Sequence, residues 1–116
     1  MIFKVFGKTN NKFSRWVCQE TVKRIKERLI EGDDVEFYDM DKPLGKNISD
    51  EENIYYVPTV ICEDGEIGEL GYIENKFALG TGDQMSDMNK SSMWWLELDK
   101  FIIEMKELKS KKDNAL

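Results

Sequence analysis

One short stretch constrains the fold more than any other: the apolar run Tyr56-Val57-Pro58-Thr59-Val60-Ile61, followed closely by Glu63-Asp64-Gly65-Glu66. The β-branched run predicts a strand, and the Asp-Gly pair predicts a turn that folds this strand into a hairpin. Proline has no N–H to donate to a central ladder, so Pro58 should stand at the start or edge of the strand. Its peptide bond is a candidate for the rare cis form, which would free a backbone edge. The stretch therefore predicts where a partner would dock.

The hydrophobic pattern predicts four strands in all. Residues 2–6 are short and almost wholly apolar, which suits the middle of a sheet. Residues 35–40 form the second predicted strand. Residues 54–62 and 66–70 form the third and fourth, joined by the Asp64-Gly65 turn.

Two helices are predicted around these strands. Ser14 is the expected N-cap of the first helix and Gly32 its stop signal. The second helix should cover residues 93–109, with an apolar stripe of helical period. Residues 41–53 contain a capping signal at Ser49 and hold at most one short helix, and residues 77–92 are expected to form a loop. The apolar stripe of the first helix is Cys18, Val22, Ile25 and Leu29.

This order of elements predicts an α/β fold with a four-stranded mixed sheet flanked by helices. A strand–helix–strand unit makes a parallel pair of strands, and the hairpin adds two more strands to it. At 116 residues the chain is expected to be one domain, covering residues 1–110. The last residues, 111–116, form a basic tail that is expected to fray in solvent.

Composition excludes several classes of function. The net charge of −6, with both signs interspersed, argues against nucleic-acid binding. The sequence offers no apolar run long enough for a membrane span and no signal-peptide pattern, so we expect a cytoplasmic protein. The chain has two cysteines and no histidine, which excludes Ser-His-Asp and Cys-His catalysis and the common zinc sites. No metal or other cofactor is therefore expected, and chemistry would rest on a thiol, carboxylates or lysines.

The predicted order resembles the thioredoxin fold, specifically glutaredoxins and the small glutaredoxin-like thioredoxins of tailed phages. Phe3-Lys4-Val5-Phe6-Gly7 is similar to the family's first strand, and Val57-Pro58-Thr59 to its cis-proline loop. Glu63-Asp64-Gly65-Glu66-Ile67-Gly68 is similar to its hairpin and following glycine. The resemblance covers residues 1–80 by motif and the last helix by position. It implies thiol–disulfide exchange with a protein or peptide thiol partner.

The sequence departs from this family at the Cys-x-x-Cys pair that begins the first helix. The only cysteine in that region is Cys18, in Arg15-Trp16-Val17-Cys18. In one register Arg15 takes the nucleophile's place and Cys18 the resolving place. In the other, Cys18 is the nucleophile of a monothiol Cys-x-x-Thr form that ends at Thr21. Helical phase favours the first, because Cys18 lies on the apolar stripe, where burial raises the pKa of a thiol.

Each candidate site residue has a structural interpretation beside its functional one. Cys18 is either a redox thiol or a small buried hydrophobe, and Cys62 is expected to be buried and inert. A disulfide between them requires their Cα atoms to lie within bridging distance. Arg15 either holds a carboxylate or phosphate of a ligand or is a solvated residue. Trp16 either offers a flat contact surface or packs in the core.

The docking loop carries the most dependable prediction, because an exposed backbone edge at Val57, Pro58 and Thr59 can pair with an extended peptide even without redox chemistry. By the resemblance, Lys8 could be a glutathione-binding lysine. The glycine pair that would complete that site is replaced by Gly68-Glu69, and Glu69 would repel the carboxylates of glutathione.

Adjacent tryptophans mark the start of the last predicted helix. A helix cannot bury both Trp94 and Trp95 on one narrow face, so at least one is expected at an edge.

Two functions follow from these predictions. The first is weak or monothiol thiol–disulfide exchange through Cys18. The second is a redox-inactive binding module that uses the groove around Arg15, Trp16 and Pro58.

Overall fold

The computed structural model describes the backbone of residues 1–75 and 88–114, and the side chains of residues 1–75 and 93–112. The predicted α/β fold with a four-stranded mixed sheet is confirmed within these residues. The elements are β1 (Ile2–Gly7), α1 (Lys12–Lys26), β2 (Asp34–Asp39), α2 (Pro43–Glu51), β3 (Thr59–Asp64), β4 (Gly68–Glu74) and α3 (Met88–Asn114).

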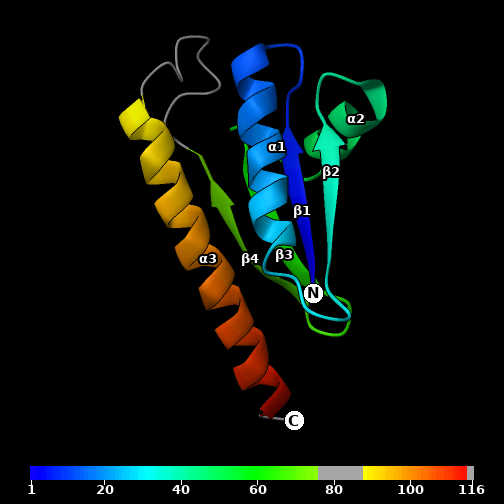
Figure 1. The fold of residues 1–116 in the computed structure, drawn as a ribbon. Coiled ribbons are helices and arrows are strands. Elements are labelled where there is room, and N and C mark those ends of the chain that lie inside the picture. Colours follow the sequence, from blue (N-terminus) through cyan, green and yellow to red (C-terminus); the bar gives the residue numbers. More distant parts are fainter. Residues whose placement is uncertain (76–87, 115–116) are drawn as a thin grey trace.

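The strands lie in the order β2-β1-β3-β4 (Figure 1). Strand β1 pairs with β2 in parallel and with β3 antiparallel, and β3 pairs antiparallel with β4. The apolar sequence of β1 suits its place inside the sheet, where Phe3, Val5 and Phe6 are fully buried.

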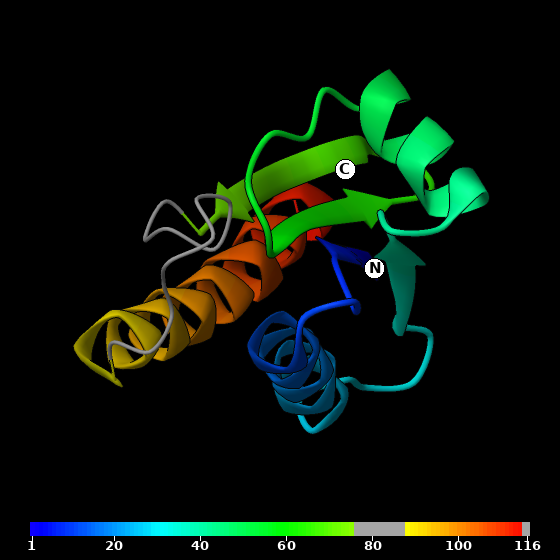
Figure 2. The ribbon, with the colours of Figure 1, turned by 90° about the horizontal axis from the view of Figure 1, so that it is seen from above.

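The helices cover the two faces of the sheet unequally. Helices α1 and α3 lie on one face and α2 lies on the other (Figure 2). Helix α2 packs on β2, at one edge of the sheet. This face of the sheet therefore stays uncovered over β4, where Tyr72 is 60% exposed. The core fills the space between the sheet and helices α1 and α3; among its members are Phe3, Val5, Val17, Ile25, Val60, Trp94, Leu98 and Ile102.

Helix α1 begins and ends earlier than predicted. Asn11, not Ser14, is its N-cap, because the Asn11 side-chain oxygen accepts hydrogen bonds from the N–H groups of Phe13 (2.8 Å) and Ser14 (3.1 Å). Ser14 is buried within the first turn. The helix ends at Lys26, and Gly32, with φ of 91°, belongs to the turn that leads into β2.

The predicted capping role of Ser49 is wrong. Helix α2 starts at Pro43, whose missing N–H costs nothing in the first turn. Ser49 lies near the other end of this helix and its hydroxyl donates to the carbonyl of Lys46 (2.8 Å). The connection between β2 and β3 holds one short helix, within the limit that the sequence predicts.

Strand β3 starts five residues later than predicted, because the chain turns sharply after α2. Asn53 has a positive φ of 57°. Its N–H donates to the carbonyl of Asp50 (3.3 Å), and the N–H of Ile54 donates to that of Ser49 (3.0 Å). These two bonds form a Schellman motif. Ile54 therefore belongs to the capping motif that follows α2, and the strand begins only at Thr59.

The hairpin between β3 and β4 is confirmed, although β4 runs from Gly68 to Glu74 and the positive φ (94°) falls on Gly68. The Asp64 carboxylate accepts hydrogen bonds from the N–H groups of Glu66 (3.0 Å) and Ile67 (3.1 Å). It also pairs with Lys109 of α3 at 2.8 Å, which lowers the pKa of Asp64 to about 2. Asp64 thus joins the hairpin to the last helix.

Helix α3 is longer than the predicted 93–109. Residues 88–92, which the sequence assigned to a loop, belong to the helix, and so do residues 111–114 of the predicted tail. The rest of the predicted 77–92 loop lies outside the described residues. Among the described helices, none combines the length and hydrophobicity that crossing a bilayer requires.

Candidate functional site

The Cys18 side chain is sealed between α1 and the end of β1. It is 1% exposed. Its sulfur sits so close above Gly7 that a Cβ added to this glycine would lie 2.2 Å from Sγ. A glycine at this position is therefore what lets helix and strand approach. The predicted inward-facing orientation of Cys18 is confirmed.

The surroundings of Cys18 disfavour its thiolate form. Burial raises the pKa of the Cys18 thiol to about 11, and the nearby carboxylates of Asp39 and Asp41 add to this increase. One hydrogen bond, from the Lys8 backbone N–H, acts in the opposite direction. Because the thiolate is the nucleophile in disulfide exchange, the pKa makes this sulfur unreactive at neutral pH.

Cys62 cannot act as a partner for Cys18. It pairs with Phe3 on β1, four residues from Gly7, which corresponds to roughly 13 Å along the strand. Both cysteines are free and buried, and burial raises the pKa of Cys62 to about 12. Its sulfur lies 3.8 Å from the Met1 sulfur. The two thiols therefore lie too far apart to form a disulfide.

The Val57–Pro58 peptide bond is cis, as the sequence suggested. Thr59 pairs with Phe6, so Pro58 lies at the end of the sheet where β1 finishes and α1 starts. The side chains of Val57, Pro58 and Thr59 are all buried. The Pro58 carbonyl accepts a hydrogen bond from the N–H of Asn75 (3.0 Å), which extends the β3–β4 pairing. These three residues thus contribute backbone and core packing rather than exposed side chains.

Arg15 and Trp16 lie in the first turns of α1 and point into solvent; Trp16 is 45% exposed. The Trp16 ring meets Phe13 edge-on at 5.6 Å and Trp95 of α3 at 5.9 Å between centroids. The Arg24 guanidinium lies over the Trp95 ring at 4.5 Å. Trp16 therefore belongs to a row of aromatic contacts between α1 and α3, and part of its ring remains exposed to solvent.

The tryptophan pair behaves as predicted. Trp94 is fully buried, and its indole N–H donates to the Thr21 hydroxyl at 3.1 Å. Trp95 is half-buried at the edge between α1 and α3.

Two carboxylates, one at the end of β2 and one in the connection to α2, hold the loop before α1. Asp41 accepts hydrogen bonds from the N–H groups of Thr9 and Asn10, both at 2.9 Å. Asp39 accepts a hydrogen bond from the Thr9 hydroxyl at 2.6 Å. This loop, which carries the exposed Lys8, is thereby fixed to the next strand. Among the described residues, no group of acidic and cysteine side chains is arranged to hold a metal ion.

The residues that the family resemblance offered for glutathione do not come together. Lys8 follows β1 at one end of the sheet. Gly68 pairs with Asp64 at the start of β4, at the opposite end. Glu69, which follows Gly68, lies on the open face of the sheet, far from Lys8.

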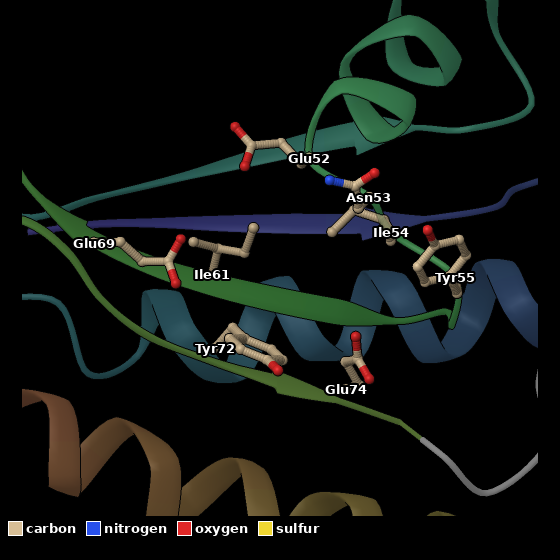
Figure 3. A pocket seen from close by; sticks show the side chains of 8 residues that line it. All are labelled: Glu52, Asn53, Ile54, Tyr55, Ile61, Glu69, Tyr72 and Glu74. Carbon is tan, nitrogen blue, oxygen red and sulfur yellow. The ribbon is translucent and has the colours of Figure 1, made fainter.

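The open face of the sheet carries a groove, which the sequence analysis missed (Figure 3). It encloses about 300 Å³ between the segment that follows α2 and strand β4. The alternation of Tyr72 and Glu74 with Gly71 and Ile73 was a usable signal for one wall. The lining residues are Glu52, Asn53, Ile54, Tyr55, Ile61, Glu69, Tyr72 and Glu74.

Comparison of the chain with protein-family models, with curated proteins and with solved structures finds no match. A functional assignment therefore depends on two surfaces: the Arg15–Trp16 surface at the start of α1, and the groove on the open sheet face.

Proposed function

We propose that this chain is a redox-inactive binding module with a thioredoxin-like layout. The observation that carries the proposal is the burial of Cys18, a residue that is 1% exposed and whose sulfur lies against Gly7. The order of elements, the mixed sheet and the cis-proline before β3 are compatible with that layout. Exchange through Cys18, the other function that the sequence predicts, would require the sulfur to leave this packing.

The docking surface is the end of the sheet where α1 starts. Arg15 and Trp16 are exposed there, and Lys8 and Lys12 are exposed nearby. Three cations and a flat indole face suit an extended peptide segment that carries a carboxylate, because guanidinium binds carboxylate with two parallel hydrogen bonds. The carboxylates of Asp39 and Asp41, which accept hydrogen bonds from Thr9 and Asn10 of the loop, keep their negative charge. They reduce the positive charge of this surface but are outnumbered by its three cations.

Alkylation by iodoacetamide is expected to be slow at Cys18 in the native protein. A rise of the pKa from 9.0 to about 11 lowers the thiolate fraction at pH 7 about 100-fold relative to the unfolded chain. The rate should keep rising with pH up to about 11 instead of levelling off near 9. Mass spectrometry of a Cys62→Ser variant, native and in denaturant, isolates the Cys18 signal. A disulfide-reduction assay on the wild type and both single variants completes the test. The proposal would be overturned by fast alkylation of native Cys18 together with reduction activity that Cys18→Ser loses and Cys62→Ser keeps.

Selection from a displayed library of random peptides tests the binding half of the proposal. The wild-type chain is expected to enrich peptides that contain an acidic residue. Arg15→Gln and Trp16→Ala should each weaken binding of the enriched peptides, about threefold to tenfold. Lys23→Gln, an exposed change farther along α1, is the matched control and should leave binding unchanged. Failure to enrich any peptide, or enrichment that is insensitive to both variants, would contradict a docking role for this surface.

A further inference from the structure

The groove on the open sheet face has the chemistry of a cation site. Three of its lining residues, Glu52, Glu69 and Glu74, are carboxylates, and no lysine or arginine lines it. None of the three forms an ion pair within the part of the chain that the structure describes. Lys4, on the central strand, is held by Glu63 at 3.0 Å. The groove is therefore left with a net negative charge.

Two exposed tyrosine rings line the groove together with the carboxylates. Tyr55 is 76% exposed and Tyr72 is 60% exposed. In Figure 3 the Tyr72 ring lies between Glu69 and Glu74 along β4, and Tyr55 stands at the end of the groove. A planar guanidinium can stack on such a ring while it donates hydrogen bonds to a carboxylate beside it, whereas an ammonium is a compact, strongly hydrated charge.

The backbone holds this arrangement in place. The Schellman motif at Asn53 turns the chain after α2, so that Ile54 and Tyr55 form one wall. Strand β4 forms the other wall, and Ile61 of β3 contributes to the floor at 4% exposure. One wall is a paired strand, and the other is a connection whose turn is held by two backbone hydrogen bonds to α2.

We propose that this groove binds an arginine-containing basic segment of a partner protein. The guanidinium pairs with Glu69 or Glu74 and stacks on Tyr72, and the segment lies along β4. The net charge of −6 adds long-range attraction for such a partner. The groove is on the face of the sheet opposite α1 and α3, so this inference does not depend on the Arg15–Trp16 surface.

Fluorescence anisotropy with short labelled peptides tests the proposal. The probes are Gly-Arg-Gly-Arg-Gly and its copies with lysine or with citrulline, the neutral analogue of arginine, at each arginine position. The full chain should bind the arginine peptide more tightly than the lysine peptide and the citrulline peptide weakest. Affinity should fall as salt is raised toward about 0.15 M, because exposed charges are screened.

Variants in the groove then separate specific binding from overall charge. Glu69→Gln with Glu74→Gln should weaken the arginine peptide about fivefold or more. Tyr72→Ala removes no charge and should weaken it about threefold. The matched control, Glu104→Gln with Glu107→Gln, removes the same charge from exposed positions on α3 and should change affinity less than about twofold. Circular dichroism melting curves check that each variant remains folded.

Three results would overturn the proposal. One is equal weakening by the groove pair and the α3 pair, which would mean that net charge alone attracts the peptide. The second is equal binding of the arginine and citrulline peptides. The third is amide NMR shifts that fall on the start of α1 instead of on Tyr55, Ile61 and Tyr72. That last pattern would assign all binding to the Arg15–Trp16 surface, so the two proposals fail separately.

Discussion

Replacing Trp94 by alanine is expected to lower the free energy of unfolding by about 3–5 kcal/mol. The Trp94 side chain is fully buried, between α3 and α1. Its indole N–H donates to the Thr21 hydroxyl at 3.1 Å, and that hydroxyl donates to the Val17 carbonyl at 2.8 Å. Truncation therefore leaves a cavity and removes the hydrogen bond that joins the two helices. The loss is a large fraction of the ~5–15 kcal/mol that stabilises a typical domain.

Denaturant unfolding monitored by circular dichroism measures this effect. Trp94→Phe keeps most of the ring volume and loses the N–H donor, so its cost should fall between those of wild type and alanine. Leu96→Ala, on the same helix but 62% exposed, is the matched control and should change stability by less than about 0.5 kcal/mol. Equal costs for Trp94→Ala and Leu96→Ala would show that α3 does not pack against α1 as described.

Gly7→Ala is expected to destabilise the protein by about 3 kcal/mol, because its Cβ would overpack the helix–strand contact. The added carbon would lie 2.2 Å from the Cys18 sulfur and 3.1 Å from a ring carbon of Phe37. Strand β1 lies inside the sheet, and the Cys18 Cβ would also lie only 3.2 Å from the added carbon, so rotation of the thiol leaves a tight contact and α1 is expected to shift. The same movement would expose Cys18, and its alkylation rate should rise together with the loss of stability.

Rescue by a second substitution identifies the sulfur as the cause. Cys18→Ala alone should cost about 1 kcal/mol, yet in combination with Gly7→Ala it should recover more than half of the lost stability. Gly45→Ala is the matched comparison, because its Cβ would lie 2.0 Å from the Asp39 backbone carbonyl oxygen and Cys18→Ala cannot relieve that clash. Independent, additive costs for Gly7→Ala and Cys18→Ala would contradict the contact between Cys18 and Gly7.

Features set by the chain's own periodicity could be predicted from the sequence. The apolar β1, the β-branched run after Pro58 and the stripe through Cys18 and Ile25 follow from side-chain alternation along a strand or helix. They predicted the order of elements, the mixed sheet and the inward-facing orientation of Cys18. Each of these predictions depends only on residues that lie close together in the sequence.

Choices between equally suitable residues could not be predicted. Asn11 and Ser14 are both good N-caps. The loop before α1 is held by Asp39 and Asp41, some 30 residues away in sequence, and in that loop Asn11 caps the helix while Ser14 is buried. Ser49 looked like a cap because of the acidic residues after it, yet it lies near the end of α2.

The sequence alone was enough to show that the chain contains no Cys-x-x-Cys pair and that a predicted hairpin follows a cis-proline candidate, since both are statements about consecutive residues. The packing of Cys18 against Gly7 and the placement of Tyr55 and Tyr72 along one groove needed the folded structure. These arrangements bring α1 against β1 and the segment after α2 alongside β4. Hydrophobic patterning does not encode which surfaces of distant segments meet, because that depends on how all the elements pack together.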